Sequence, residues 1–331
     1  MPVQTTSVRR FRQRPGGAVR RDRQRVSVER RAQAEKTPRL PAARDDRFVL
    51  LPSYHSEQTR EVLLQSAPGK RADRITVAYH SPDVEFDLSA RGRTLLAGTF
   101  ESELVIDGVP RVCRGDWRSV CWYADDDADY LELRLCLSES VWIDRQIVLS
   151  RREHFALLAD AVVAGGAKRI DYRISLPLAE GVVAAVDPQT REGRLATTGR
   201  VARVFPLALP QDRVLSAAGN LLQHDNCLEV TDAGTGWGLY LPVFLDWHAH
   251  RRTAPADWRS LTVTELGKVV SPDRAAGHRL RLGRRQWLIH KSLDMPEEVR
   301  AVLGLHTRYE SVVGAFDSTG TVDPIVMVET E

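Results

Sequence analysis

From about residue 47 onward, the chain is a succession of short runs rich in Val, Leu, Ile, Thr, Tyr and Trp. Gly, Pro, Asp and Asn separate these runs at spacings typical of antiparallel sheets. Few windows have helical periodicity, and there is no regular alternation of strand and helix as in a parallel sheet. The sequence also lacks a repeat of fixed length that would indicate a propeller. It therefore predicts an all-β fold of antiparallel strands.

Two strand pairs are predicted by local pattern alone. VWIDRQIVLS (141–150) and HFALLADAVV (154–163) are linked by a short polar turn and form a long antiparallel pair. HRLRLGRRQWLIH (278–290) alternates toward a turn at Gly283 and then returns. Both segments predict hairpins.

The segment DYLELRLCL (129–137) shows how the strands should pack. Leu alternates with Tyr130, Glu132, Arg134 and Cys136, a pattern typical of a strand that is covered on one side only. A single wide sheet would expose half of its Leu and Val, so a second sheet must cover the apolar face. With 43% hydrophobic residues the chain can build such a core. We predict a large antiparallel β-sandwich, similar to a supersandwich, over residues 47–331.

Charge is distributed unevenly and separates an arm from this body. Residues 1–47 carry 14 Lys and Arg against 5 Asp and Glu, so their net charge is +9 within a chain of net charge +3. We predict that residues 1–46 form a disordered basic arm, because they contain no apolar run that could repay chain ordering. A tether to nucleic acid or to an anionic surface is the alternative role for the arm, although we do not expect nucleic acid as a partner.

Targeting signals are not apparent. Arg9 and Arg10 precede Phe11 as in a twin-arginine signal, but polar residues follow where an apolar stretch is needed. No run approaches the roughly 20 apolar residues of a membrane helix. We expect no membrane partner and, by default, a cytoplasmic location.

Two segments carry a family resemblance. Residues 61–98 contain an apolar strand, a Gly-containing turn, His80, Asp83, and the run Gly-Arg-Thr-Leu-Leu (92–96). Residues 144–160 place Arg145, Phe155 and Asp160 in a hairpin of apolar residues. Together they resemble the C-terminal β-sandwich domain of heparinase II/III-like polysaccharide lyases over about residues 47–165.

The resemblance implies a role with carbohydrate. In that family the sugar chain lies between the β-domain and a helical (α/α) toroid, which supplies most of the proton-transfer groups, and no toroid can be fitted to this sequence. The implied function is a module that binds or scaffolds acidic polysaccharide without a complete active site. Two alternatives stay open: a lyase completed by a toroid protein on another chain, and a structural protein tethered by its basic arm.

Candidate site residues follow from the resemblance and from local chemistry. His80 is the candidate catalytic residue, because elimination beside a uronate carboxylate needs a base and a cationic group or donor, and a histidine can fill one of these two roles in a composite cleft. A histidine in an ordinary surface turn is the alternative. The candidate substrate-binding residues combine matched arginines with tryptophans beside charged residues, which can stack on sugar rings; they are Arg93, Trp117, Trp122, Arg145 and Trp247. The alternative for the tryptophans is that each covers an edge of the sandwich.

The segment FLDWHAHRR (244–252) raises the question of a metal. Asp246, His248 and His250 would share one face of a strand that continued through Arg251, and zinc binds such ligands. The alternative is a strand that runs out into a loop. Where family members hold zinc ligands in the β-domain, this chain has Gly98 and Asp144 in place of Asp and His. We therefore predict no cofactor, with zinc at residues 246–250 as the open alternative.

Overall fold

The structure is a computed structural model that describes residues 53–317 and 319–329. Within these ranges the regular elements are antiparallel strands and one short 3₁₀ helix, η1 (Ala249–Arg251). The all-β prediction is confirmed. The predicted arm over residues 1–46 and its boundary at residue 47 lie outside the described residues. Among the residues described, no helix has the length and apolar character that crossing a membrane requires.

The first part of the chain forms a five-stranded sheet, which we call the N-terminal sheet. Its strands follow in chain order: β1 (Tyr54–Ser56), β2 (Glu61–Gln65), β3 (Arg74–Ala78), β4 (Glu85–Ala90) and β5 (Arg93–Thr99). Alternate residues are buried along β3 and β4, as expected for a sheet with one face on a core.

An 11-stranded central sheet occupies the middle of the molecule. Its main path is β12 (Val183–Val186), β13 (Gly193–Thr197), β14 (Arg200–Pro206), β16 (Cys227–Asp246), β11 (Phe155–Pro177), β10 (Trp142–Ser150), β9 (Ala128–Cys136) and β8 (Arg118–Ala124). Off this path, β6 (Glu101–Ile106) pairs with β11 and with β7 (Val109–Arg111), and β15 (Leu221–His224) pairs with β16.

The last part of the chain forms two smaller sheets. The C-terminal sheet has the order β17 (Ala256–Leu261), β20 (Ala275–Leu282), β21 (Arg285–Ser292), β24 (Ser311–Phe316) and β25 (Val322–Val328). A four-stranded sheet beside it contains β19 (Lys268–Val270), β18 (Val263–Glu265), β22 (Arg300–Val302) and β23 (Leu305–Thr307).

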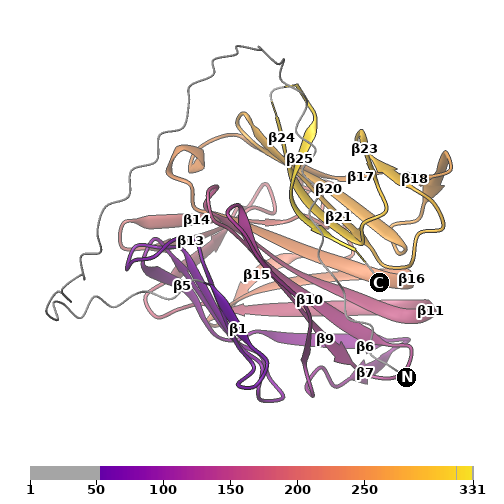
Figure 1. The fold of residues 1–331 in the computed structure, drawn as a ribbon, viewed down its shortest axis with the longest axis horizontal. Helices are drawn as coiled ribbons and strands as arrows, with labels where there is room; N and C mark the ends of the chain where they lie inside the picture. The colour runs from indigo at the N-terminus through magenta and orange to yellow at the C-terminus, as the bar shows by residue number, and fades with distance from the viewer. Residues whose placement is uncertain (1–52, 318, 330–331) are drawn as a thin grey trace, which may run out of the picture.

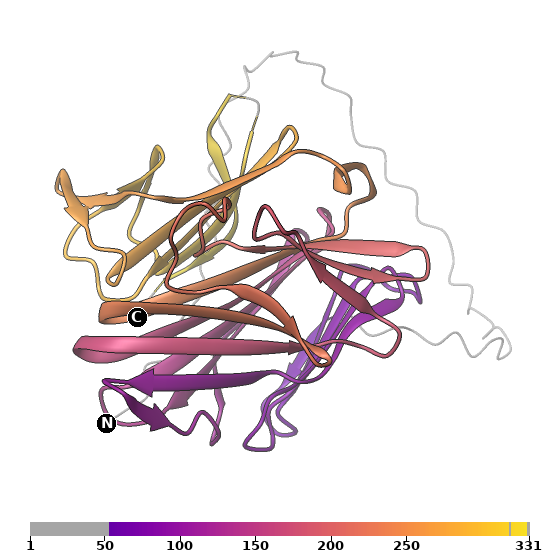
Figure 2. The same cartoon turned by 180° about the vertical axis from the view of Figure 1, so that it is seen from behind.

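The sheets stack in layers, with the central sheet between the other two large ones. Figure 1 shows the indigo N-terminal sheet and the yellow C-terminal sheet on different sides of the magenta strands, and Figure 2 shows the same arrangement from behind. One apolar core joins the N-terminal sheet to one face of the central sheet, for example through Phe86 and Ile147. A second core joins the opposite face to the C-terminal sheet, through Val148 and Trp287.

This layering corrects the prediction that the strand at 129–137 is covered on one side only. Tyr130 and Glu132, on its polar face, are 1% exposed. The C-terminal sheet covers that face, and its Lys291 donates to Glu132 at 2.8 Å. The alternation of polar and apolar residues marks a boundary between two kinds of buried surface, not between core and solvent.

Both predicted hairpins are confirmed. Trp142–Leu149 of β10 pair with Val163–Ala156 of β11, and Ala275–Leu282 of β20 pair with Ser292–Arg285 of β21 across the Gly283 turn. β10 runs from Trp142, at one end of the central sheet, to Ser150, at the end where the turn to β11 lies. These two ends of the sandwich hold different sets of the predicted site residues.

Candidate functional site

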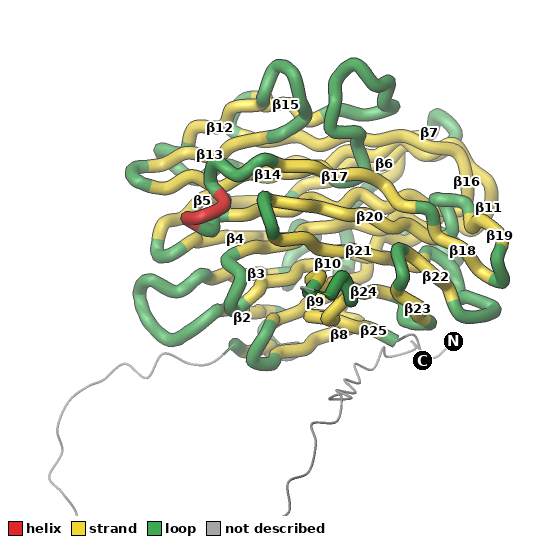
Figure 3. Tube along the Cα trace, turned by 90° about the horizontal axis from the view of Figure 1, so that it is seen from above, coloured by secondary structure: helices red, strands yellow, loops and turns green. Residues whose placement is uncertain are grey.

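Four loop segments meet at the end of the sandwich that follows Ser150, and we call this surface the histidine end. Its segments are residues 66–73, 91–93, 151–154 and 247–252. The first two are tightly packed, because a Cβ on Gly92 would lie 2.3 Å from the carbonyl oxygen of Lys70. Gly92 has φ +79°, a left-handed conformation that glycine adopts readily. Figure 3 shows η1, in red, at this end of the molecule.

An imidazole fixed by a buried carboxylate lies at the centre of the histidine end. Nδ1 of His154 lies 2.6 Å from Oδ2 of Asp73, whose side chain is fully buried while that of His154 is 29% exposed. The backbone N–H of Arg91 donates to Oδ1 of Asp73 at 2.7 Å. Because the carboxylate engages Nδ1, it sets the ring orientation and leaves Nε2 as the nitrogen for an incoming group.

Two more imidazoles continue from His154. Strand β16 ends at Asp246, the backbone N–H of Trp247 donates to the carbonyl of His154 at 3.1 Å, and η1 follows. The ring centroids of His154 and His248 are 5.6 Å apart, and those of His248 and His250 are 5.5 Å apart. Burial, together with Arg251 and the neighbouring histidines, lowers the pKa of His248. His248 is therefore held neutral near pH 7.

The geometry contradicts a shared strand face for Asp246, His248 and His250. Asp246 is 1% exposed and accepts two hydrogen bonds from Arg251, at 2.9 and 2.6 Å. His248 instead caps η1, where its Nδ1 accepts from the backbone N–H of His250 at 3.3 Å. These three side chains do not converge, because the strand ends before the histidines and the first ligand points inward.

Several cations lie on the segments that carry the three imidazoles or meet them. Lys70, Arg71, Arg93 and Arg252 are exposed and Arg91 is partly exposed. The nearby carboxylates are engaged within the protein: Asp73 with His154, Asp246 with Arg251, and Glu153 with Arg251 and Arg285. Within the four segments, the exposed charged groups are thus cationic, while Asp126 in the adjoining β8–β9 turn is an exposed acidic residue.

Four other predicted site residues lie away from the histidine end. His80 is exposed in the loop between β3 and β4, whereas Arg93 begins β5 at the opposite end of the strands of the same sheet. Trp122 is partly buried and lies 5.7 Å from the ring of His55. Trp117 and Arg145 also lie toward the His80 end, because the N–H of Gly115 donates to Pro82 and Arg145 donates to the carbonyl of Phe100, whose N–H donates to Val84. The structure therefore separates the predicted residues into two groups.

Three predicted binding residues are buried and serve the core. Arg145 is fully buried, donates to both carboxylate oxygens of Asp160 at 2.9 and 2.8 Å, and lies over the rings of Phe100 and Trp117. Trp117 is 1% exposed, and Trp247, at the histidine end, is 6% exposed. None of the three presents a face on which a sugar ring could stack.

Sequence reasoning missed Asp73 and His154. They lie 81 positions apart and carry no shared motif, so only the packing of the two sheets brings them together. Arg145 and Asp160 did carry a signal, because a hairpin turn at 151–154 places these opposite charges across from each other.

Comparison with solved structures shows which known folds this architecture resembles. The fold is similar to that of a heparan sulfate lyase. HepC from Pedobacter heparinus superposes with a TM-score of 0.52 at 12% identity, over 74% of this chain and 43% of that chain. A heparinase III structure gives a TM-score of 0.49 at 10% identity, over 72% and 42%. The predicted resemblance is confirmed at the level of fold, and this chain spans less than half the length of these lyases.

Sequence comparisons add nothing to the structural match. No family model and no curated protein sequence matches this chain.

Proposed function

We propose that this chain is a carbohydrate-binding β-sandwich module and that its histidine end binds the acidic groups of a polysaccharide. The observation that carries the proposal is the set of exposed cations on the segments around His154, with the carboxylates of Asp73, Asp246 and Glu153 engaged inside. The similarity in fold to a heparan sulfate lyase supports a carbohydrate ligand. The ligand class is thus a glycan bearing carboxylate or sulfate groups.

The chemistry of recognition follows from the side chains. Guanidinium groups bind sulfate and carboxylate through two parallel hydrogen bonds, which gives both charge and geometry. Arg71 and Arg93 are exposed and adjacent to the Gly92 turn, so a flexible chain of acidic sugars can reach them. His154, held by Asp73, adds one oriented ring nitrogen between them and η1. Such binding should weaken with salt, because exposed charges are screened.

Isothermal titration with heparan sulfate tests this proposal. Replacing Arg71 and Arg93 together with Ala should weaken binding about tenfold or more, since a charge-assisted hydrogen bond contributes about 1.5–3 kcal/mol. The matched control replaces Arg111 and Arg118, which are exposed toward the opposite end of the sandwich. This double substitution removes the same amount of positive charge. Absence of heat with the unmodified protein, or an equal loss in the control, would contradict the proposal.

A second candidate is a polysaccharide lyase completed by a helical toroid protein. What favours it is the pairing of His154 with Asp73, because a carboxylate-oriented imidazole suits proton abstraction beside a uronate carboxylate. His80, exposed at the opposite end, remains the alternative base. The chain would be mixed with toroid proteins and the absorbance of unsaturated uronate followed. If this absorbance rises, and either His154→Gln or His80→Gln abolishes the rise, the substituted histidine is the base. If the absorbance rises in no mixture, this candidate function is ruled out.

A further inference from the structure

A second cleft lies between the central and C-terminal sheets, near the end of the sandwich opposite the histidine end. It has a volume of about 400 Å³, within the range of about 300–1,000 Å³ that is usual for small-molecule sites. Trp142, at the start of β10, lines it, whereas the histidine end follows the last residue of β10. The two sites are therefore distinct.

Aromatic and apolar side chains form the wall of this cleft. Trp237 of β16 is 49% exposed and Met295 is 67% exposed. The backbone N–H of Trp237 donates to Asp273 at 2.8 Å. A Cβ on the preceding Gly236 would lie 2.2 Å from that same carboxylate, so glycine is needed for this close approach. An exposed indole is thereby held on a fixed backbone.

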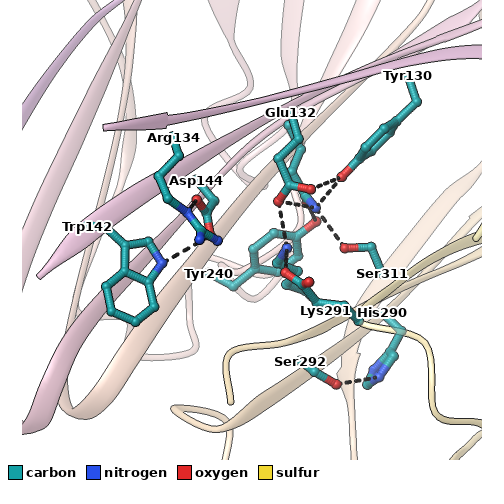
Figure 4. A network of polar contacts seen from close by, with 12 residues as sticks. Tyr130, Glu132, Arg134, Trp142, Asp144, Tyr240, His290, Lys291, Ser292 and Ser311 are labelled. Carbon is teal, nitrogen blue, oxygen red and sulfur yellow. Dashed lines mark hydrogen bonds and ion pairs between the residues drawn. The ribbon is translucent and has the colours of Figure 1, made fainter. Parts of the chain in front are cut away.

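The second tryptophan is held by polar groups. Nε1 of Trp142 donates to Asp144 at 3.1 Å, and the guanidinium of Arg134 lies 5.4 Å from the ring centre of Trp142. Arg134 also donates to both oxygens of Asp144, at 2.5 and 2.8 Å, and its side chain remains 31% exposed. Figure 4 shows Arg134, Asp144 and Trp142 together beside the buried network. This arrangement gives a partly exposed cation next to an aromatic face.

The floor of the cleft is a buried polar network. Nζ of Lys291, which is 1% exposed, donates to Glu132 at 2.8 Å and to Glu310 at 2.5 Å. Burial lowers the pKa of Lys291, but Glu132 and Glu310 outweigh it and raise that pKa, so the ammonium stays charged. Burying such groups costs free energy unless they are well paired. The network, visible in Figure 4, fixes the floor.

The charges of the cleft select the class of ligand. Glu132, Asp144 and Glu310 offer oxygens close enough to hold a metal ion, but Lys291 already lies between Glu132 and Glu310. Among the residues that line the cleft, Arg134 and Lys291 stand against the carboxylates of Asp144, Asp294 and Glu310, which leaves one net negative charge. An acidic ligand is therefore disfavoured, and a hydroxyl-rich neutral ligand fits the aromatic wall and polar rim.

We propose that this cleft binds a neutral sugar ring, which stacks on the indole of Trp237 and places its hydroxyls near Arg134. Sugar rings suit such a site, because their C–H faces pack on aromatic rings while their hydroxyls form hydrogen bonds at the edge. The cleft is independent of the acidic-polysaccharide site proposed above. One module would then engage a glycan, or two glycans, through sites of opposite electrostatic character.

Titration of the full chain with cellohexaose, mannohexaose and xylohexaose tests the proposal, with the indole N–H resonances as readout. We expect at least one hexasaccharide to shift the resonances of Trp237 and Trp142. Trp237→Ala should weaken this binding at least tenfold and leave heparan sulfate binding unchanged. Val214→Ala, at a residue 89% exposed elsewhere, is the control for loss of surface apolar area.

Several outcomes would overturn the proposal. They are no shift with any neutral hexasaccharide, unchanged affinity in Trp237→Ala, or a cleft that responds only to heparan sulfate. Should Trp237→Ala fail to fold, Arg134→Gln should weaken binding of the same hexasaccharide at least threefold. Unchanged affinity in Arg134→Gln would also overturn the proposal. Loss of heparan sulfate binding in Arg71→Ala with Arg93→Ala, by contrast, concerns only the histidine end.

Discussion

Oδ2 of the buried Asp73 lies 2.6 Å from Nδ1 of His154, and this contact ties the N-terminal sheet to the turn between β10 and β11. The same carboxylate accepts the backbone N–H of Arg91 at 2.7 Å. A single buried side chain thus connects three loops of the histidine end. Its removal should affect stability as well as ligand binding.

We expect Asp73→Ala to lower the free energy of unfolding by about 1–3 kcal/mol, because the donors of Arg91 and His154 lose their acceptor. Urea unfolding measures this change. Asp83→Ala is the matched control, since Asp83 pairs with an arginine whose side chain is 65% exposed, and such surface pairs contribute about 0–1 kcal/mol. Equal effects of the two substitutions would show that Asp73 does not organise the loops.

Arg145→Met tests whether Arg145 serves the core and not a ligand. The change leaves Asp160 buried without its ion pair, which costs about 3–5 kcal/mol. We expect a large decrease in the urea concentration at the midpoint of unfolding. The protein that remains folded should keep its affinity for heparan sulfate. A variant of normal stability that no longer binds heparan sulfate would restore the role predicted from the sequence.

The buried ammonium of the cleft floor can be tested by a double-mutant cycle. Lys291→Met leaves the carboxylates of Glu132 and Glu310 facing each other, so unfolding should become easier by about 3–5 kcal/mol. Adding Glu132→Gln should recover part of this loss, because it removes one of the unpaired charges. Strictly additive destabilisation in the double variant would mean that the two groups do not interact.

Two buried histidines predict an acid-sensitive fold. Burial lowers the pKa of both His278 and His290 to about 4. As pH falls from about 6.5, these two histidines bind protons in the unfolded chain but stay neutral in the folded protein. The free energy of unfolding therefore declines until about pH 4. The slope is at most about 1.4 kcal/mol per pH unit for each histidine.

Urea unfolding of the unmodified protein and of His290→Gln, over this pH range, checks that expectation. The substitution should reduce the slope, because the glutamine amide does not titrate. His224→Gln is the control, since the side chain of His224 is 68% exposed. Parallel pH profiles for the protein and for His290→Gln would contradict the assignment.

The fold follows from sequence further than the site does. Strand runs and hairpins are local, so residues 141–163 and 278–290 show their pairing directly. The third layer is not local: nothing within DYLELRLCL shows that Lys291 will neutralise Glu132 from another sheet. A buried polar face and a solvated one have the same alternation, and the one-sided interpretation was therefore wrong.

Site prediction had a similar limit. Tryptophans beside charged residues resemble sugar platforms, yet Trp117 and Trp247 are buried, while Trp237 and Trp142 line a cleft. Flanking charges do not show which face of a strand a tryptophan occupies. His248 and His250 do lie at the histidine end, which we propose as a binding surface. The carboxylate that organises this surface, however, is Asp73 and not Asp246.

The most direct test of the account is the response of the nine histidines to a heparan sulfate oligosaccharide, followed by the imidazole resonances of the full chain. We predict shifts at His154, His248 and His250 that diminish as salt is raised, with His80 unaffected. Shifts centred on His80, with the histidine end silent, would contradict it.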